Sequence, residues 1–345
     1  MKKLTVLSLL VLVAFASCKK DTTNNNTTTT TSPAQPQLKF VFKFDNTQTR
    51  LDGFGNPSTV PSNHCAQSPT FNGMSAHYIE MTQNNTTAVG HGTVLYTTPT
   101  IVSTPFTVTS GSTTATYTDA IDFSKETVVG DGQQFFSIPL SQVTAGTYPY
   151  LRISVAYQNY DIRYAILPNT PVSSTYTTPA GPTYYSTGTI ASFIGYNTQI
   201  GSYTIKTQTD VVNAAKQQGY WSFESAPYVV GTSTTTVPYS KGQAPQGATT
   251  VVNPLFSTSA VPPGSCLVTG QFVSAASTST NPIYAPLVIT GHETSDIVIT
   301  VSMSTNNSFE WLHNASNPVD GYIYPLNGDV VVDMGVRGMM PKLPQ

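Results

Sequence analysis

The chain has 345 residues, of which only 9% are charged, and its formal net charge at pH 7 is −2. So little charge argues against a helical bundle or coiled coil, whose solvated faces need Glu, Lys and Arg. It also argues against a nucleic-acid partner, which requires a basic surface to neutralise phosphates. Thr and Tyr are favoured in strands, and 25 Pro with 24 Gly supply turns. The composition therefore predicts an all-β protein.

Residues 1–17 have the pattern of a secretory signal peptide. Two lysines precede an apolar run that ends at Phe15, and the small residues Ala16 and Ser17 follow it. The run is too short to cross a membrane as a helix, which needs about 20 apolar residues. The next residue is Cys18, which is either the first residue of the mature chain or a bystander after an ordinary signal peptide.

The small residues before Cys18 resemble the lipobox of bacterial outer-membrane lipoproteins of the Bacteroidota type. The resemblance implies that Cys18 carries a lipid anchor that includes palmitate, and several acyl chains on one residue hold a protein at a membrane. A lysine pair and Asp21 follow the cysteine, and in such lipoproteins basic residues followed by acids act as an export signal. The resemblance therefore implies the outer membrane as the location, with the cell surface preferred over the periplasmic face.

The segment 18–36 is rich in Thr and Asn. Between residues 21 and 36 it contains no aliphatic residue larger than Ala, apart from Pro, and no aromatic residue. Such a segment cannot bury enough surface to offset its chain entropy. We therefore predict a disordered tether with a root-mean-square reach of roughly 25 Å, which holds a folded module away from the membrane.

After the tether the sequence changes to an alternation of period two. Phe40, Phe42 and Phe44 share one face of a predicted strand, with lysines on the other face. In a second strand, Tyr157 is expected to face the core and Arg152 the solvent. The predicted strands that follow the first one are 93–96, 106–108, 135–138, 151–157, 203–206, 266–272, 287–290, 297–303 and 330–334.

Many short alternating runs separated by turn residues predict an antiparallel β-sandwich. Residues 37–345 are enough for one large sandwich or two consecutive ones. The segment 169–187 has Pro and Gly but no alternation, so a boundary between two sandwiches is expected near it. At most one or two short helices are expected, and one is predicted at 211–218, with Asp210 as N-cap and Gly219 after its end.

Two cysteines, Cys65 and Cys266, remain in the chain once Cys18 is acylated. Because thiols oxidise outside the cytoplasm, an even pair favours a disulfide, which would join the first strands to the last third of the chain. The alternative is two buried thiols, since a free cysteine behaves as a small apolar residue.

Three of the five histidines, His64, His77 and His91, lie close together in the sequence. Imidazole with thiolate or thioether suits copper, and imidazole with carboxylate suits zinc. On a regular strand, His77 would share a face with Ile79, while Glu80 would point away. The histidines therefore predict either a metal site or a polar edge of the sandwich with hydrogen-bonded imidazoles.

A histidine-bearing strand, the pair Asp122-Phe123 and the stretch 139–148 together resemble the MbnP-like family of copper-associated β-sandwich lipoproteins. That family's Tyr-Tyr-hydrophobic-Ser segment is absent from the first strands. The resemblance implies a β-sandwich that binds copper or zinc through histidines. Apart from such a metal ion, no cofactor is expected.

Two carboxylates stand close to the only tryptophans in the chain. Glu224 follows Trp221 by three residues, and Glu310 directly precedes Trp311. Two carboxylates on a β-scaffold are the machinery of a glycoside hydrolase. An aromatic ring beside a carboxylate also suits a sugar-binding module, because the ring stacks on C–H faces while the carboxylate accepts hydroxyl hydrogen bonds. The alternative is that both tryptophans belong to the core.

Motifs that carry chemistry are missing elsewhere. The sequence has no Cys-x-x-Cys, His-Glu-x-x-His, Gly-x-Ser-x-Gly or Walker motif. We therefore predict a lipid-anchored cell-envelope protein, not an enzyme, with a binding or structural and assembly role. Its expected partners are the membrane through the lipid and an envelope protein or glycan, but no nucleic acid. The alternatives are an MbnP-like metal-binding protein and a glycan-binding module or glycoside hydrolase.

Overall fold

In the computed structural model, the strands extend from Gln37 in the first strand to Lys342 in the last. The predicted signal peptide, lipidated Cys18 and the tether up to residue 34 lie outside the described residues. In the described part of the chain, no helix has both the length and the apolarity to cross a membrane. The residues that the structure describes are 35–110, 113–171, 177–178, 180–226, 228–230, 233–235, 240–244 and 265–345.

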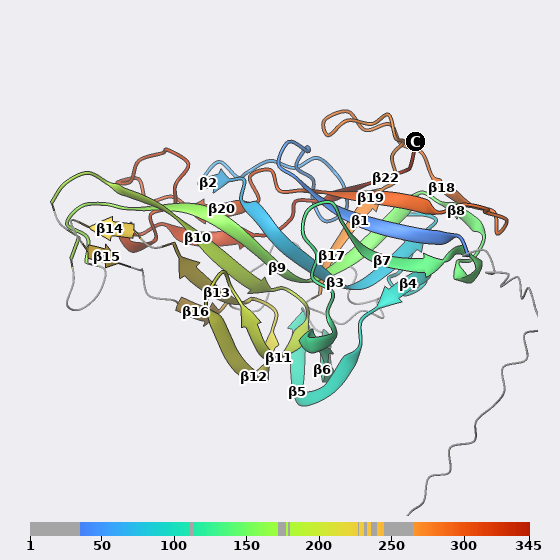
Figure 1. The fold of residues 1–345 in the computed structure, drawn as a ribbon, viewed down its shortest axis with the longest axis horizontal. Coiled ribbons are helices and arrows are strands. Elements are labelled where there is room, and N and C mark those ends of the chain that lie inside the picture. Colours follow the sequence, from blue (N-terminus) through green and yellow to red (C-terminus); the bar gives the residue numbers. More distant parts are fainter. Residues whose placement is uncertain are drawn as a thin grey trace, which may run out of the picture. The chain divides into compact units, whose positions relative to one another are not determined.

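The described chain is almost entirely β, which confirms the fold class predicted from composition and alternation (Figure 1). Its helical elements are the short 3-10 turns η1 (Phe123–Lys125), η2 (Leu140–Gln142) and η4 (Pro325–Asn327). The strands are β1 (Gln37–Asp45), β2 (His64–Gln67), β3 (Thr70–Thr82), β4 (Thr93–Thr97), β5 (Thr100–Ser110), β6 (Thr113–Asp122), β7 (Gln133–Pro139), β8 (Gly146–Tyr148), β9 (Tyr150–Ile166), β10 (Tyr184–Phe193), β11 (Asn197–Thr204), β12 (Thr209–Gln217), β13 (Tyr220–Ser225), β14 (Tyr228–Val230), β15 (Ser233–Thr235), β16 (Ser240–Gln243), β17 (Cys266–Gln271), β18 (Leu287–Ile289), β19 (Ile297–Ser304), β20 (Phe309–Leu312), β21 (Val330–Met334) and β22 (Met339–Lys342).

A seven-stranded antiparallel sheet, hereafter the central sheet, organises the fold. Its order is β16-β13-β10-β9-β3-β4, and β17 also pairs with β9. Along one edge of β9, residues 150–155 pair with β17 and residues 157–166 pair with β10, while β3 pairs along the other edge. This single long strand therefore connects both halves of the sheet.

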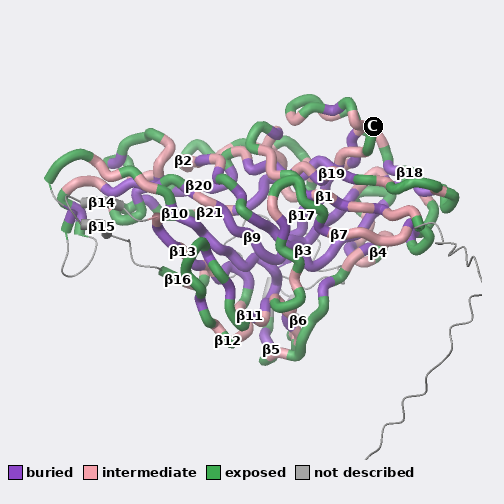
Figure 2. Tube along the Cα trace, in the orientation of Figure 1, coloured by how far each residue is buried: buried purple, intermediate pink, exposed green. Residues whose placement is uncertain are grey.

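Both faces of the central sheet are covered. On one face, side chains of β3, β9, β10 and β17 share the largest apolar cluster, hereafter the main cluster, with those of β1, β7, β19 and β20. These partners come from the sheets β22-β19-β1-β7 and β2-β20-β21. On the other face, smaller aromatic clusters join β9 and β10 to the sheet β12-β11-β6-β5. Buried residues therefore run along β3, β9 and β17 (Figure 2).

Most strand pairs are antiparallel, as predicted, with two exceptions. β1 pairs with β19 in parallel, and β6 pairs with β11 in parallel over a short stretch. The pair β1–β19 brings the first and last thirds of the chain together. It does so by backbone pairing of two strands whose alternation was evident in the sequence.

The alternation predicted for β1 and β19 is confirmed. Phe40 and Phe42 are fully buried, and Phe44 packs against the same cluster. In β19, Ile299 and Val301 are also fully buried. Burial of each such side chain contributes about 1.5–3 kcal/mol relative to exposure.

The alternation predicted for β9 is wrong after Val155. At that point the edge partner changes from β17 to β10. The residues in the main cluster change from odd to even positions, so Tyr157 packs on the opposite face with Phe193, and Tyr160 returns to the main cluster. Arg152 was expected to face solvent, but it is fully buried and pairs with Glu80 at 3.1 Å.

The helix predicted at 211–218 is also wrong, because this segment forms β12 and pairs antiparallel with β11. The expected N-cap, Asp210, instead accepts hydrogen bonds from the hydroxyls of Tyr203 and Tyr220 and pairs with Lys241 at 2.8 Å. Two adjacent β-branched valines favour the strand. Gly219 adopts a φ of 90° in the tight turn into β13, where a residue with a side chain would be strained.

The segment 169–187, parts of which lie outside the described residues, connects β9 to β10. Those two strands are neighbours and pair over ten residues from Tyr184 to Phe193. Thr178 ties the described part of the connection together, since its hydroxyl accepts from the backbone N–H of Thr170 at 2.7 Å and donates to the carbonyl of Leu167 at 2.9 Å.

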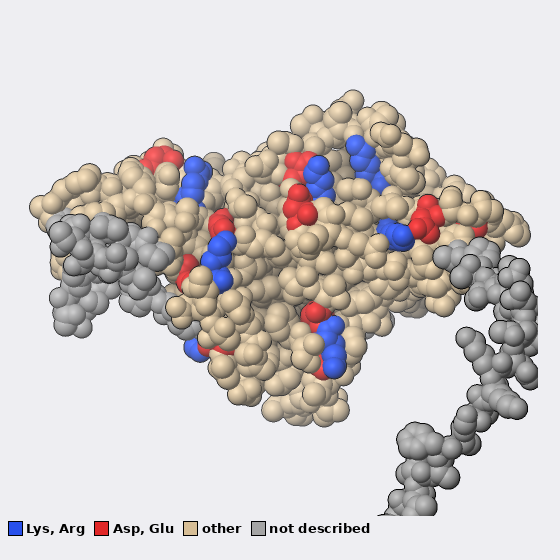
Figure 3. Space-filling view, in the orientation of Figure 1, with Lys and Arg blue, Asp and Glu red and all other residues tan. Residues whose placement is uncertain are grey.

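Several of the few charged side chains form ion pairs. On the face drawn in Figure 3, basic and acidic residues lie next to one another on an otherwise uncharged surface. Exposed pairs include Lys39 with Asp296 at 2.5 Å and Lys206 with Asp161 at 2.8 Å. Such exposed pairs contribute little stability, and they leave the charge of this face locally balanced.

Candidate functional site

Trp221 and Glu224 lie on opposite faces of β13. Trp221 faces the side of the main cluster, whereas Glu224 reaches the turn between β11 and β12. There its carboxylate accepts hydrogen bonds from the backbone N–H groups of Lys206, Thr207 and Gln208 at 2.9–3.0 Å. Burial raises the pKa of Glu224, but a hydrogen bond from the Thr207 hydroxyl and those from the backbone N–H groups outweigh burial and hold it below its ordinary value. Glu224 therefore shapes a turn.

Glu310 and Trp311 also point in different directions. Trp311 is 1% exposed and packs in the main cluster beside Phe309. Glu310 is equally buried, and its carboxylate accepts a hydrogen bond from Arg50. The other carboxylate oxygen of Glu310 lies 2.9 Å from Nδ1 of His64. Each tryptophan therefore points away from the carboxylate that neighbours it in sequence.

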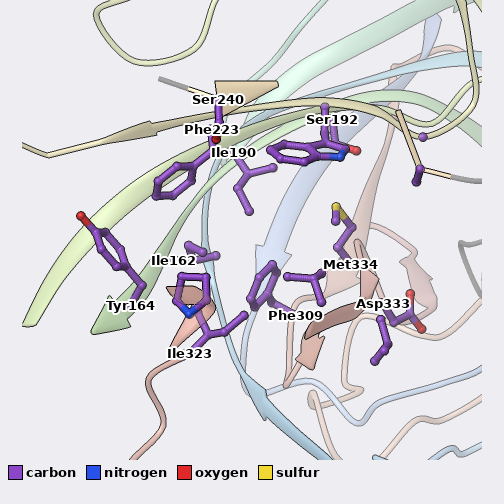
Figure 4. Close-up of a pocket in the computed structure, with 16 residues that line it drawn as sticks. Ile162, Tyr164, Ile190, Ser192, Phe223, Ser240, Phe309, Ile323, Asp333 and Met334 are labelled. Atoms are coloured by element: carbon purple, nitrogen blue, oxygen red, sulfur yellow. The ribbon is translucent and has the colours of Figure 1, made fainter. Parts of the chain in front are cut away.

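An apolar pocket opens on the side of β13 that carries Trp221 (Figure 4). We call it the apolar pocket. One wall is the central sheet, with side chains from β9, β10 and β13, and the opposite wall is formed by β20, β21 and the segment before η4. Its volume is about 390 Å³, within the range of about 300–1,000 Å³ of small-molecule sites. The lining side chains that define it are Ile162, Tyr164, Ile190, Ser192, Trp221, Phe223, Phe309, Ile323, Val331 and Met334.

Strand alternation explains why these residues meet. In β10, Ile190 and Ser192 face the pocket, while the residues between and after them pack on the other face of the sheet. In β13, Trp221 and Phe223 do the same. Figure 4 shows Phe223 and Ile190 on one side of the cavity and Phe309 on the other. Two sheets that do not close fully on each other therefore leave this space.

The pocket contains few polar groups. Ser192 and Ser240 contribute hydroxyls from the central sheet. Asp333 also lines it, but its carboxylate already pairs with Arg337 at 2.7 Å, and Arg337 is 2% exposed. A pocket with large apolar walls and a small number of polar atoms suits an uncharged, mostly apolar ligand.

The three predicted histidines occupy separate places. His64 in β2 contacts Glu310, His77 in β3 contacts the hydroxyl of Ser154 at 2.7 Å, and His91 lies in the turn before β4. Across the described ranges, no three His, Cys, Asp or Glu side chains are grouped so that they could hold a metal ion.

The face predicted for His77 is wrong for a definable reason. Irregularities in the pairing of β3 with β9 occur on both sides of Ala76. As a result Ala76 and Ile79 both lie in the main cluster, and His77 faces the other side of the sheet, toward Ser154. Burial lowers the pKa of His77 to about 3, so the imidazole is neutral at any physiological pH.

The disulfide predicted between Cys65 and Cys266 is not present in the structure, where both are free thiols. Cys65 lies opposite Trp311 in the pair β2–β20, whereas Cys266 lies opposite Val155 in the pair β17–β9. Burial raises the pKa of the Cys266 thiol to about 12. The two side chains therefore behave as small apolar residues, the alternative left open by the sequence.

One buried carboxyl outside the pocket has a pKa near neutrality. Burial raises the pKa of Glu126 to about 7, against the opposing effect of the Ser75 and Thr98 hydroxyls. Because the unfolded pKa is about 4.3, the native state binds a proton that the unfolded state has lost. The stabilising contribution is complete below about pH 4 and is lost as pH rises through 7.

We therefore expect Glu126→Gln to flatten the pH dependence of stability. Relative to the wild type, the variant gains roughly 1–3 kcal/mol of unfolding free energy at pH 8 and little at pH 4.5. Urea unfolding at the two pH values measures this, with Glu293→Gln as a control, because the pKa of Glu293 is lowered by backbone hydrogen bonds from the turn after β18. An identical pH profile for Glu126→Gln and wild type would contradict the buried carboxyl.

Sequence reasoning identified Trp221 as a site residue but missed the rest of the apolar pocket. Ile162, Ile190 and Phe309 alternate as ordinary core residues do, so no sequence signal separates them from the core. Comparison with protein families, curated proteins and solved structures found no match to this chain.

Proposed function

We propose that this protein is a lipid-anchored, non-catalytic binding protein of the cell envelope, and that its folded module takes up a small apolar molecule. The observation that carries the proposal is the apolar pocket, with Trp221 in its wall. A pocket of this size and lining is the default binding-site hypothesis for a protein without a bound ligand.

The aromatic residues of the pocket determine the ligand chemistry. Trp221, Phe223 and Phe309 come from both walls, so a flat apolar group that enters the pocket contacts rings on two sides. Aromatic side chains bury large areas and favour offset or edge-to-face contacts with other rings. An apolar ring system or a short branched hydrocarbon satisfies these walls, whereas a charged ligand would lose its hydration without compensation.

We assign no enzyme role because the neighbouring carboxylates are already engaged in contacts within the fold. Glu224 is saturated by backbone N–H groups of one turn, and Glu310 and Asp333 both contact the buried Arg337. A general acid or base must reach a reacting atom with an available proton site. Carboxylates engaged in this way serve the fold, so binding is the better assignment for the pocket.

The anchor in this proposal is supported by the lipobox resemblance and the tether. With Cys18 acylated, the predicted tether holds the module near an outer membrane that is itself a source of apolar molecules. A flexible link leaves the orientation of the pocket free.

The proposal is tested with N-phenyl-1-naphthylamine, a neutral apolar fluorophore whose emission rises in apolar surroundings. The mature chain from residue 19 onward, which lacks the lipid, is expected to bind it saturably. Trp221→Ala weakens binding at least tenfold, equivalent to about 1.4 kcal/mol, because the ring contact in the wall is lost. The matched control is Tyr185→Ala, which removes an aromatic side chain that is 54% exposed and lies outside the pocket. Equal affinity of the Trp221→Ala variant and wild type would contradict the proposal.

A further inference from the structure

A second, polar hollow lies on the other face of the central sheet. We call it the Tyr117 hollow. It has a volume of about 490 Å³ and is bounded by β3, the β4–β5 connection, β6 and the residues after β10. None of its lining residues belongs to the apolar pocket. Its lining residues include His77, Tyr78, Thr97, Thr100, Tyr117, Asp119 and Tyr196.

Aromatic rings form one side of this hollow. Phe106 contacts both Tyr117 and Tyr196, with ring centroids 5.5 and 6.3 Å apart, and so supports the two tyrosines from behind. His77 meets Tyr196 edge to face at 5.4 Å. Tyr117 is only partly buried, so its ring is held in place and still accessible.

Polar groups stand beside these rings. The carboxylate of Asp119 accepts a hydrogen bond from the hydroxyl of Tyr196 at 3.1 Å. Burial and this nearby charge raise the pKa of Tyr196, so its phenol stays protonated and keeps donating. Thr97 and Thr100 are exposed at the rim and add hydroxyls that both donate and accept.

His77 adds an imidazole to the hollow. The side chain is 6% exposed, and its Nε2 contacts the hydroxyl of Ser154 at 2.7 Å. Among the described residues, its Nδ1 has no hydrogen-bond partner. A ligand hydroxyl can hydrogen-bond to this nitrogen in either tautomer, because a hydroxyl both donates and accepts.

We propose that the Tyr117 hollow is a sugar-binding site. A pyranose has C–H faces that stack on an aromatic ring and hydroxyls that hydrogen-bond to carboxylate, imidazole and threonine groups. The hollow offers each of these: the Tyr117 ring for stacking, Asp119 as an acceptor, and His77 as a buried polar end.

Other ligand classes fit the hollow less well. An apolar molecule would cover Asp119 and His77 without supplying hydrogen bonds, so both groups would lose hydration without compensation. An anion would meet the Asp119 carboxylate, and none of the described residues that line the hollow is a lysine or arginine. A neutral, hydroxyl-rich ligand avoids both penalties.

The site is tested by saturation-transfer-difference NMR on the mature lipoprotein, Cys18 included, in lauryldimethylamine oxide, a detergent without a sugar headgroup. The probes are maltose, cellobiose, lactose, trehalose, sucrose and α-1,6-mannobiose at millimolar concentration. At least one disaccharide is expected to give transfer signals from its C–H protons. Tyr117→Ala and Asp119→Asn each weaken its binding at least fivefold, whereas Tyr117→Phe, which keeps the ring, stays within twofold of the wild type.

Two controls separate this inference from the apolar pocket. Trp221→Ala and Tyr185→Ala should leave disaccharide binding unchanged, and both remain folded by circular dichroism. Absence of transfer signals for all six sugars, or signals that persist in both Tyr117→Ala and Asp119→Asn, would overturn the sugar site. Loss of binding in Trp221→Ala alone would place the sugar in the other pocket and equally overturn it.

Discussion

Replacing Glu310 by glutamine is expected to lower the free energy of unfolding by about 3–5 kcal/mol, the usual cost of breaking a buried ion pair. The Glu310 carboxylate is 1% exposed and contacts three cationic or titratable groups, Arg50, His64 and Arg337. The variant keeps the shape of the side chain but leaves Arg50, which is 11% exposed in its side chain, without a carboxylate partner.

The measurement is urea or thermal unfolding at pH 7. Burial raises the pKa of Glu310, but hydrogen bonds from His64 and Arg50 and the charge of Arg337 outweigh burial and hold it below its ordinary value. The wild-type contribution is therefore present above about pH 4.3 and is lost as pH falls below it, so the difference between variant and wild type shrinks in acid. Asp296→Asn, at an exposed pair with Lys39, is the control and leaves stability nearly unchanged. A Glu310→Gln variant as stable as the control at pH 7 would contradict the buried cluster.

Replacing Cys18 by serine is expected to release the protein from the membrane fraction completely and to abolish incorporation of labelled palmitate. The reason is that acylation needs the Cys18 thiol, and several acyl chains on one residue are what holds such a protein at a membrane.

The matched control is Cys65→Ser, which removes another thiol in the folded module and should leave both membrane association and labelling intact. Fractionation and palmitate labelling of the two variants in the native host give the result. Membrane association of Cys18→Ser together with an unlabelled wild type would contradict the lipid anchor.

Elements with regular alternation could be predicted from the sequence, and irregular ones could not. The Phe40–Phe42 and Ile299–Val301 pairs are buried as expected because β1 and β19 pair without a break. In β9 the inward face changes where the edge partner changes, after Val155. Such a change of face is determined by neighbouring strands from distant sequence, and a local pattern does not contain it.

The polar interior was the least predictable part of the fold. Arg152 and Glu80 lie on different strands and bury their charges together, where a period-two pattern would place arginine in water. The sequence also failed to predict β12. A good N-cap residue suggested a helix there, but the segment forms a strand that pairs with β11. Both features depend on contacts between neighbouring strands.

The two Trp–Glu pairs show how strand geometry alone restricts a site hypothesis. Residues at i and i+3, such as Trp221 and Glu224, point to opposite faces of a strand, as do neighbours such as Glu310 and Trp311. A joint site was therefore excluded as soon as both segments were strands. Trp221 remains a site residue for a different reason, since its own face borders a cavity.

The most direct test of the proposed binding role uses the two tryptophans as reporters. Fluorine NMR of the mature chain from residue 19, labelled with 5-fluorotryptophan, should give two resonances, assigned with Trp311→Phe. On addition of N-phenyl-1-naphthylamine, the Trp221 resonance is predicted to shift with a saturable dose dependence, because ring-current effects act only at contact distance, while the buried Trp311 resonance moves much less. If the Trp221 resonance stays in place while the fluorophore binds, or if no binding occurs at all, the apolar pocket is not a ligand site.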